Sequence, residues 1–103
     1  MDESKKLAIE IVGELEPQGR VTKENLLAKV AELGGISVED LTDYHKREPA
    51  RSLRNAAYYL AYNSLGLSLS ETASLLNRKN HTTVMNGIGV MATNIYEFTR
   101  RSF

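Results

Sequence analysis

The sequence contains no cysteine, no tryptophan and only two prolines among its 103 residues. The absence of cysteine excludes disulfides, thiolate metal sites and cysteine nucleophiles, and it is typical of proteins in a reducing compartment. No apolar run approaches the roughly 18 residues that a membrane-spanning helix requires, and the N-terminal MDESKK lacks the apolar stretch of a signal peptide. We therefore expect a soluble, cytoplasmic protein with no membrane partner.

The chain also has no formal net charge, because 13 Lys and Arg residues balance 13 Asp and Glu residues. The charges are unevenly distributed: residues 1–40 carry five basic and nine acidic side chains, whereas residues 41–103 carry eight basic and four acidic ones. Uneven surface charge is common in itself. A neutral total nevertheless does not exclude a polyanionic partner, since the local potential decides where such a partner binds.

No segment shows the apolar–polar alternation of a strand, so the sequence predicts an all-α fold. Predicted helices cover residues 2–16, 22–33, 49–65 and 69–76, with a short helical turn near 37–41 and a last helix from 81 past 95. Expected N-caps are Thr22, Ser37 and either Asp2 or Ser4, and Gly34-Gly35 and Gly66 mark helix ends. We divide the chain into an N-terminal amphipathic extension, residues 1–20, and a compact helical domain, residues 21–103.

A helix-turn-helix is predicted at residues 68–95, where a short helix, a tight polar turn and a longer helix follow one another. Ser68 and Glu71 have the spacing of a capping box at the start of the short helix. In such a motif the second helix enters the major groove of duplex DNA with its N-terminal residues against base edges. Polar side chains cluster at that N-terminus: Arg78, Lys79, Asn80, His81, Thr82 and Thr83.

The side chains in this cluster suit base recognition. Asn80 can pair through both amide atoms with adenine, and the methyl groups of Thr82 and Thr83 can meet thymine methyl groups. The N-terminus of the helix adds backbone donors for phosphate. The alternative is that Asn80 only caps the helix and that the threonines only bond to the nearby backbone.

Four short segments follow one another along the chain: ISVEDL at 36–41, RNAAYYLA at 54–61, SLxE at 68–71 and NHTTV at 80–84. Together with the basic loop after the first segment, they resemble the C-terminal DNA-binding domain of the bacterial replication initiator DnaA, in which the last segment is DHTTV. The similarity covers about residues 22–95. It implies an all-α fold with a Trp-repressor-like helix-turn-helix, and sequence-specific binding of duplex DNA at short A·T-containing sites.

The resemblance also assigns roles by position. It places Asn80, His81 and Thr82 at base edges. It makes Lys46 or Arg47 the loop cation that family members insert into the minor groove, and it brings the backbone amides of Leu69 and Ser70 close to phosphate. With the basic residues of the turn, the expected phosphate or groove contacts are Lys46, Arg47, Arg54, Leu69, Ser70, Arg78, Lys79 and Thr83.

The chain departs from the family pattern at three places. Asn80 replaces an aspartate and therefore suits adenine better than cytosine. Asn77-Arg78 replaces two glycines, and asparagine tolerates a left-handed backbone better than arginine does. Gly87 and Gly89 stand where alanine or basic residues are usual, at a cost of roughly 1 kcal/mol of helix propensity each.

Other function classes have less support. The two histidines lie on different predicted elements, and neither a nucleophile elbow nor the P-loop pattern GxxxxGK[ST] is present, so we expect no enzyme activity, no metal, no cofactor and no nucleotide. We also expect Tyr58, Tyr59 and Tyr62 at the rim of the core with their hydroxyls in water, rather than stacked on bases.

Two readings of the whole chain stay open. The first is a stand-alone transcriptional or replication regulator that binds double-stranded DNA, which the HTTV motif and the basic loop favour. The second is a helical protein-interaction module that has lost DNA binding, which the neutral charge and the glycines after Val84 favour. The stripe of Leu7, Ile11 and Leu15 either pairs with a second copy in a homodimer or covers its own domain.

Overall fold

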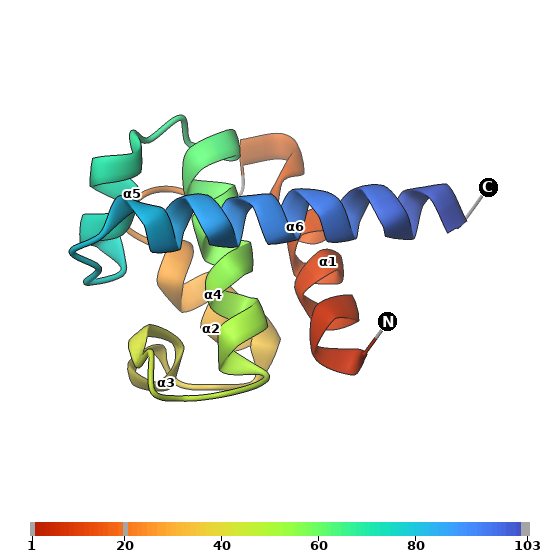
Figure 1. The fold of residues 1–103 in the computed structure, drawn as a ribbon, viewed down its shortest axis with the longest axis horizontal. Helices are drawn as coiled ribbons and strands as arrows, with labels where there is room; N and C mark the ends of the chain where they lie inside the picture. Colours follow the sequence, from red (N-terminus) through yellow and green to blue (C-terminus); the bar gives the residue numbers. More distant parts are fainter. Residues whose placement is uncertain (1, 20, 102–103) are drawn as a thin grey trace.

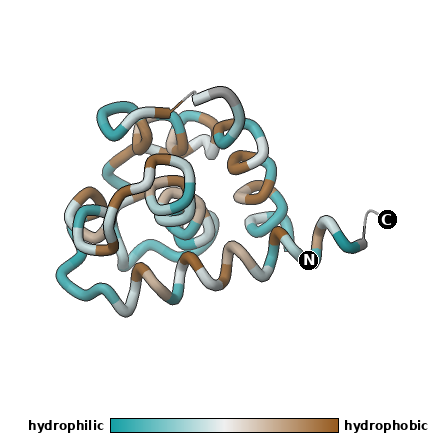
Figure 2. The backbone as a smooth tube through the Cα atoms, turned by 90° about the horizontal axis from the view of Figure 1, so that it is seen from above, coloured by the Kyte–Doolittle hydropathy of each residue, from teal (hydrophilic) through white to brown (hydrophobic). Residues whose placement is uncertain are grey.

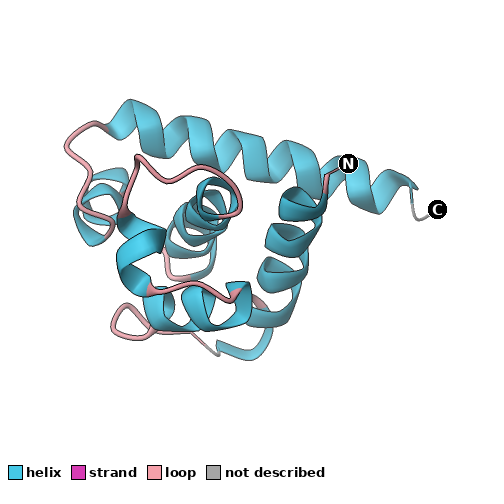
Figure 3. Cartoon of the chain, turned by 90° about the horizontal axis from the view of Figure 1, so that it is seen from below, coloured by secondary structure: helices cyan, strands magenta, loops and turns pink. Residues whose placement is uncertain are grey.

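The computed structural model describes residues 2–19 and 21–101, and within these ranges it contains helices and turns but no strand (Figure 3). The helical elements are, in order, α1 (Glu3–Leu15), the 3₁₀ turn η1 (Pro17–Gly19), α2 (Leu26–Gly34), α3 (Val38–Thr42), α4 (Ala50–Tyr59), the π-helical turn η2 (Leu60–Ser64), α5 (Leu69–Leu75) and α6 (His81–Arg101). The predicted all-α fold is confirmed. Residues 1, 20, 102 and 103, at the ends of the two predicted regions, lie outside the described residues.

The α1 and α3 helices begin at predicted caps, whereas α2 does not. Asp2 Oδ1 accepts a hydrogen bond from the Lys5 amide at 2.9 Å, and Ser37 Oγ accepts one from the Asp40 amide at 3.0 Å. Thr22 and Asn25 hydrogen-bond to each other, since the Thr22 amide donates to Asn25 Oδ1 at 2.7 Å and the Asn25 amide donates to Thr22 Oγ1 at 3.2 Å. The predicted N-cap at Thr22 is therefore wrong: Thr22 and Asn25 close a turn, and Asn25 is the N-cap of α2, which starts at Leu26.

The α4 helix is the centre of the fold, and α1, α2, α3 and α6 all pack against it (Figure 1). Its residues Leu53, Ala56 and Ala57 have no exposed surface, and Leu60 continues this buried face into η2. Hydrophobic positions recur along each helix, as Figure 2 shows, and their buried members form one core. Burial of this shared core holds the helices in place.

The predicted helix at 49–65 ends where the sequence predicts, but its last turn has a different geometry. Its last turn is π-helical, because the Leu65 amide donates to the carbonyl of Leu60, five residues back, at 3.0 Å. Gly66 then stops it with a φ of 68°, as the sequence predicts.

The α6 helix crosses α4, and its C-terminal half extends past α1 (Figure 1). A Cβ atom on Gly87 would lie 2.5 Å from a carbon of the Tyr58 ring and 2.7 Å from Asn55 Oδ1, whereas one on Gly89 would meet nothing within 4 Å. Gly87 therefore allows α6 and α4 to approach closely, a role that helix propensity alone did not indicate. In the described ranges no helix combines the length and the apolar character needed to cross a membrane.

Candidate nucleic-acid interface

The short helix α5 starts with a complete capping box. Ser68 Oγ accepts from the Glu71 amide at 3.0 Å, and Glu71 Oε1 accepts from the Ser68 amide at 3.2 Å. Hydrogen bonding of the Glu71 carboxyl to Ser68, first to its backbone amide and then to its side chain, holds the pKa of that carboxyl below its ordinary value. The amides of Leu69 and Ser70 lie in the first turn of α5, where a helix has no internal acceptors for its N–H groups.

The turn between α5 and α6 ends α5 in a Schellman motif. Asn77 has a φ of 57°, its amide donates to the Ser74 carbonyl at 3.1 Å, and the Arg78 amide donates to the Ala73 carbonyl at 2.7 Å. Asparagine thus takes the left-handed position that glycine would otherwise fill, and Arg78 keeps an ordinary negative φ. The predicted helix-turn-helix is confirmed in its local geometry.

The N-terminus of α6 presents the predicted polar cluster to solvent. Asn80, His81, Thr82 and Thr83 are all exposed, and the fully buried Val84 fixes the rotation of the helix. Asn80 Oδ1 accepts a hydrogen bond from the Thr82 amide at 2.8 Å. Asn80 is therefore an N-cap, and its oxygen already has a donor, whereas a bidentate pair with adenine would use both the oxygen and the nitrogen of the amide.

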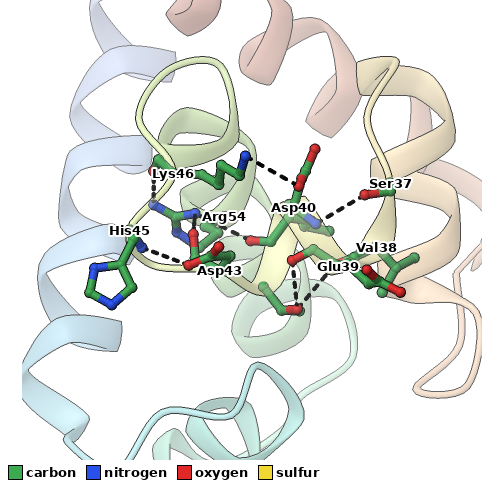
Figure 4. A network of polar contacts seen from close by, with 10 residues as sticks. Ser37, Val38, Glu39, Asp40, Asp43, His45, Lys46 and Arg54 are labelled. Atoms are coloured by element: carbon green, nitrogen blue, oxygen red, sulfur yellow. Dashed lines mark hydrogen bonds and ion pairs between the residues drawn. The ribbon is translucent and has the colours of Figure 1, made fainter.

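Residues 43–48, the basic loop, connect α3 to α4. Its cationic side chains Lys46 and Arg47 are exposed, and Lys46 Nζ lies 3.8 Å from the Asp40 carboxylate (Figure 4). This ion pair is at the surface and contributes little to stability. Tyr44, also in the loop, is 66% exposed and packs against the ring of His45 with 4.2 Å between centroids.

Arg54 lies under the basic loop and is only 6% exposed. Its guanidinium donates to the carbonyls of Asp43 at 2.7 Å, Lys46 at 2.9 Å and Leu41 at 3.4 Å, and Figure 4 shows it beside Asp43 and Lys46. Burial, followed by the charge of Arg78, lowers the pKa of Arg54. The donors of this predicted DNA contact are thus directed at the backbone of the protein itself.

Arg78 connects the turn before α6 to three other parts of the fold. Its Nε donates to Tyr58 Oη at 3.0 Å, a terminal nitrogen donates to the Thr42 carbonyl at 3.4 Å, and its guanidinium carbon lies 5.0 Å from the centroid of the Tyr44 ring. Tyr58 is 2% exposed and its hydroxyl binds Arg78, so the expectation of a hydroxyl in water is wrong for this residue. Tyr59 is half-buried and Tyr62 is exposed.

A groove of about 560 Å³ separates the basic loop from α6, with α4 as its floor. Five cationic side chains line it, and no carboxylate does: the cations are Lys46, Arg47, Arg51, Arg54 and Arg78. Thr83, Asn86 and Val90 line the side formed by α6. Lys79 lies outside this lining and is exposed in the turn.

The sequence analysis did not single out Asn86, Asn55 or Tyr44 as members of this groove. The spacing of Thr83, Asn86 and Val90 by three and four residues was the available signal, because such residues share one face of a helix. Asn55 and Tyr44 carried no comparable signal.

Comparison with known proteins agrees with this geometry. Residues 23–90 match the family described as the bacterial dnaA protein helix-turn-helix. Relatives named chromosomal replication initiator protein DnaA include those of Cutibacterium acnes, 34% identical over 83 residues (78% of this chain, 17% of that protein), and Bordetella pertussis, 38% identical over 72 residues (68% and 15%). The chain spans only about one-sixth of the length of these relatives. No solved structure matches significantly. The chain therefore belongs to the bacterial DnaA helix-turn-helix family, a family of DNA-binding domains.

Proposed function

We propose that the domain binds duplex DNA sequence-specifically, with the N-terminus of α6 in the major groove and the basic loop in the adjacent minor groove. The observation that carries this proposal is the cationic groove between the two elements. Adjacent major and minor grooves are separated by one sugar-phosphate strand, so an element in each groove leaves that strand between them. Five cations without a carboxylate suit a polyanionic strand at this place.

The proposed contacts divide into reading and positioning. Asn80, His81 and Thr82 face base edges, and Thr83 faces a phosphate beside them. Because the oxygen of Asn80 caps α6, its amide nitrogen is the atom free to donate to a purine N7. Lys46 or Arg47 enters the minor groove. The Lys79 side chain and the backbone amides of Leu69 and Ser70 contact phosphates.

An anisotropy titration tests this proposal. Labelled duplexes that carry replication-initiator-type sites, and random duplexes of equal length, are titrated over a salt series. If about four to six phosphates are neutralised, log K against log[salt] has a slope near −4 to −5. Arg47→Gln should reduce that slope by about one. Its matched control, Lys29→Gln on α2, replaces an exposed cation outside the groove and should leave the slope unchanged.

A salt-independent titration would contradict DNA binding and favour the protein-interaction alternative. Equal affinity for specific and random duplexes would leave DNA binding intact but contradict base reading by α6.

We further propose that the chain acts by occupying its sites, as a regulator of transcription or a competitor of the replication initiator. Residues 1–103 contain no GxxxxGK[ST] motif, so an ATP-driven step has no P-loop in these residues to carry it. The supporting experiment is displacement: the chain should release a full-length initiator from a shared duplex site in a concentration-dependent way without added ATP. Failure to compete at saturating concentration would contradict this mode of action.

A further inference from the structure

We propose that Arg78 is a positioning residue that braces the basic loop against the recognition helix, and thereby sets the spacing between the minor-groove and major-groove contacts. This inference rests on the proposed DNA-binding mode. Sequence analysis placed Arg78 among the direct phosphate or groove contacts. A residue that holds the loop in place predicts different effects of substitution from a residue that contacts DNA directly.

The contacts of Arg78 reach three elements at once. Its own backbone lies in the turn that leads into α6, while its side chain binds Tyr58 on α4, the carbonyl at the end of α3 and the ring of Tyr44 in the basic loop. A guanidinium holds such partners in a fixed plane because its donors form a rigid fork. The loop and the start of α6 are therefore fixed to a common floor.

Tyr58 is a firm anchor for this brace. Its ring is 2% exposed and lies against Gly87 so closely that a Cβ there would collide with it. A side chain packed in this way has little freedom to follow Arg78 if the turn moves. The position of Arg78 is consequently set by the packing between α4 and α6.

Arg78 and Arg54 bind different backbone carbonyls at the end of α3 and in the basic loop. Arg54 binds the carbonyls of Leu41, Asp43 and Lys46, and Arg78 binds the carbonyl of Thr42 between them. Loss of Arg78 therefore leaves the loop attached through Arg54 but releases its link to the turn. We expect a looser loop in a folded protein.

Three variants separate a brace from a phosphate contact. Tyr58→Phe removes only the hydroxyl that Arg78 binds and changes no charge. Arg78→Lys keeps the positive charge but loses the fork that reaches Tyr58 and Thr42 together. Arg78→Gly removes both the positive charge and the guanidinium. Tyr62→Phe, a change of the same kind at an exposed tyrosine, is the control for the loss of a hydroxyl.

The first measurement needs no DNA. Hydrogen–deuterium exchange followed by mass spectrometry should show faster uptake in residues 43–48 for Tyr58→Phe, Arg78→Lys and Arg78→Gly, and unchanged uptake for Tyr62→Phe. Far-UV circular dichroism confirms that each variant is folded. Because this readout is independent of nucleic acid, the brace can be supported even if the domain fails to bind DNA.

The second measurement is affinity for a specific duplex over a salt series. Tyr58→Phe and Arg78→Lys should each raise Kd by roughly fivefold to tenfold, the effect of one lost hydrogen bond, with the salt slope unchanged. A direct phosphate contact predicts the opposite: near wild-type binding for Tyr58→Phe and Arg78→Lys, and a slope reduced by about one for Arg78→Gly. That pattern, with wild-type exchange in the loop, would overturn the proposal.

Discussion

A guanidinium carries five N–H donors in one plane, so an arginine can serve nucleic acid or the protein's own carbonyls, depending on where its neighbours place it. Arg54 lies under the basic loop, and three carbonyls occupy its donors. A buried cation with such partners is costly to remove, because the carbonyls then lose their donor in a site that water reaches poorly. We therefore interpret Arg54 as the support of the basic loop.

Arg54→Ala should lower the free energy of unfolding by about 3 kcal/mol, since it leaves three carbonyls under the loop without their donor. DNA binding should weaken equally on specific and random duplexes, with an unchanged salt slope. Arg51→Ala is the matched control, because Arg51 is an exposed arginine on the same helix that also lines the groove. It should preserve stability and reduce the salt slope by about one. Urea denaturation and the salt titration measure these effects, and a stable Arg54→Ala protein with a reduced slope would contradict the interpretation.

The residues of the candidate site were predictable from the sequence only where local pattern decides their place. The exposed cluster Asn80–Thr83 follows from a polar turn before an amphipathic helix, and the structure places it as expected. The directions of the Arg54 and Arg78 side chains depend on carbonyls 8 to 36 residues away. No periodicity encodes such contacts, because they exist only once α3, α4 and α6 have packed.

At the scale of elements, caps and helix ends were predictable because they depend on neighbours within four residues. The capping box at Ser68, the cap at Ser37 and the left-handed stop at Gly66 all agree with the sequence. The predicted cap at Thr22 does not, because the N-cap of α2 is Asn25. The π-helical turn η2 was not foreseen, since Leu60–Ser64 has ordinary helical composition. Gly87 was counted only as a cost in helix propensity, because its benefit lies in a distant neighbour, Tyr58.

The two glycines of α6 offer a matched test of this packing. Gly87→Ala should lower the free energy of unfolding by about 1–3 kcal/mol, because the added Cβ meets the buried Tyr58 ring and Asn55. Gly89→Ala enters open space and should raise stability by about 0.5–1 kcal/mol, the usual gain of alanine over glycine in a helix. Urea denaturation followed at 222 nm measures both, and equal effects of the two substitutions would contradict the close approach of α4 and α6.

At the scale of the whole molecule, the basic residues of the second part of the sequence gather in one groove. The α1 helix carries exposed Glu3, Glu10 and Glu14 and lies on the side of α4 opposite α5 (Figures 1 and 3). The cationic groove lies between the basic loop and α6. A chain without net charge can therefore present a positive groove to DNA, because the local potential acts on an approaching polyanion.

The apolar stripe of α1 is packed inside the same chain: Ile11 is 2% exposed, Leu15 is 3% exposed, and the helix lies against α4, α2 and α6. We therefore expect α1 to complete the core of a monomer, although sequence analysis also considered it a surface for pairing two copies. Ile11→Ala should lower the free energy of unfolding by about 2–4 kcal/mol, the range for a large-to-small change in a packed core.

The exposed neighbour Glu10 supplies the control, since Glu10→Ala should change stability by no more than about 0.5 kcal/mol. Light scattering should give the same monomeric mass for the unchanged chain and for both variants. If the unchanged chain were instead a dimer, and Ile11→Ala converted it to a stable monomer with weaker binding to paired sites, α1 would be the pairing surface. The two outcomes are distinguishable. If Ile11 belongs to the core of its own domain, Ile11→Ala lowers the stability and leaves the mass unchanged. If Ile11 belongs to an interface, Ile11→Ala halves the mass and leaves the monomer stable.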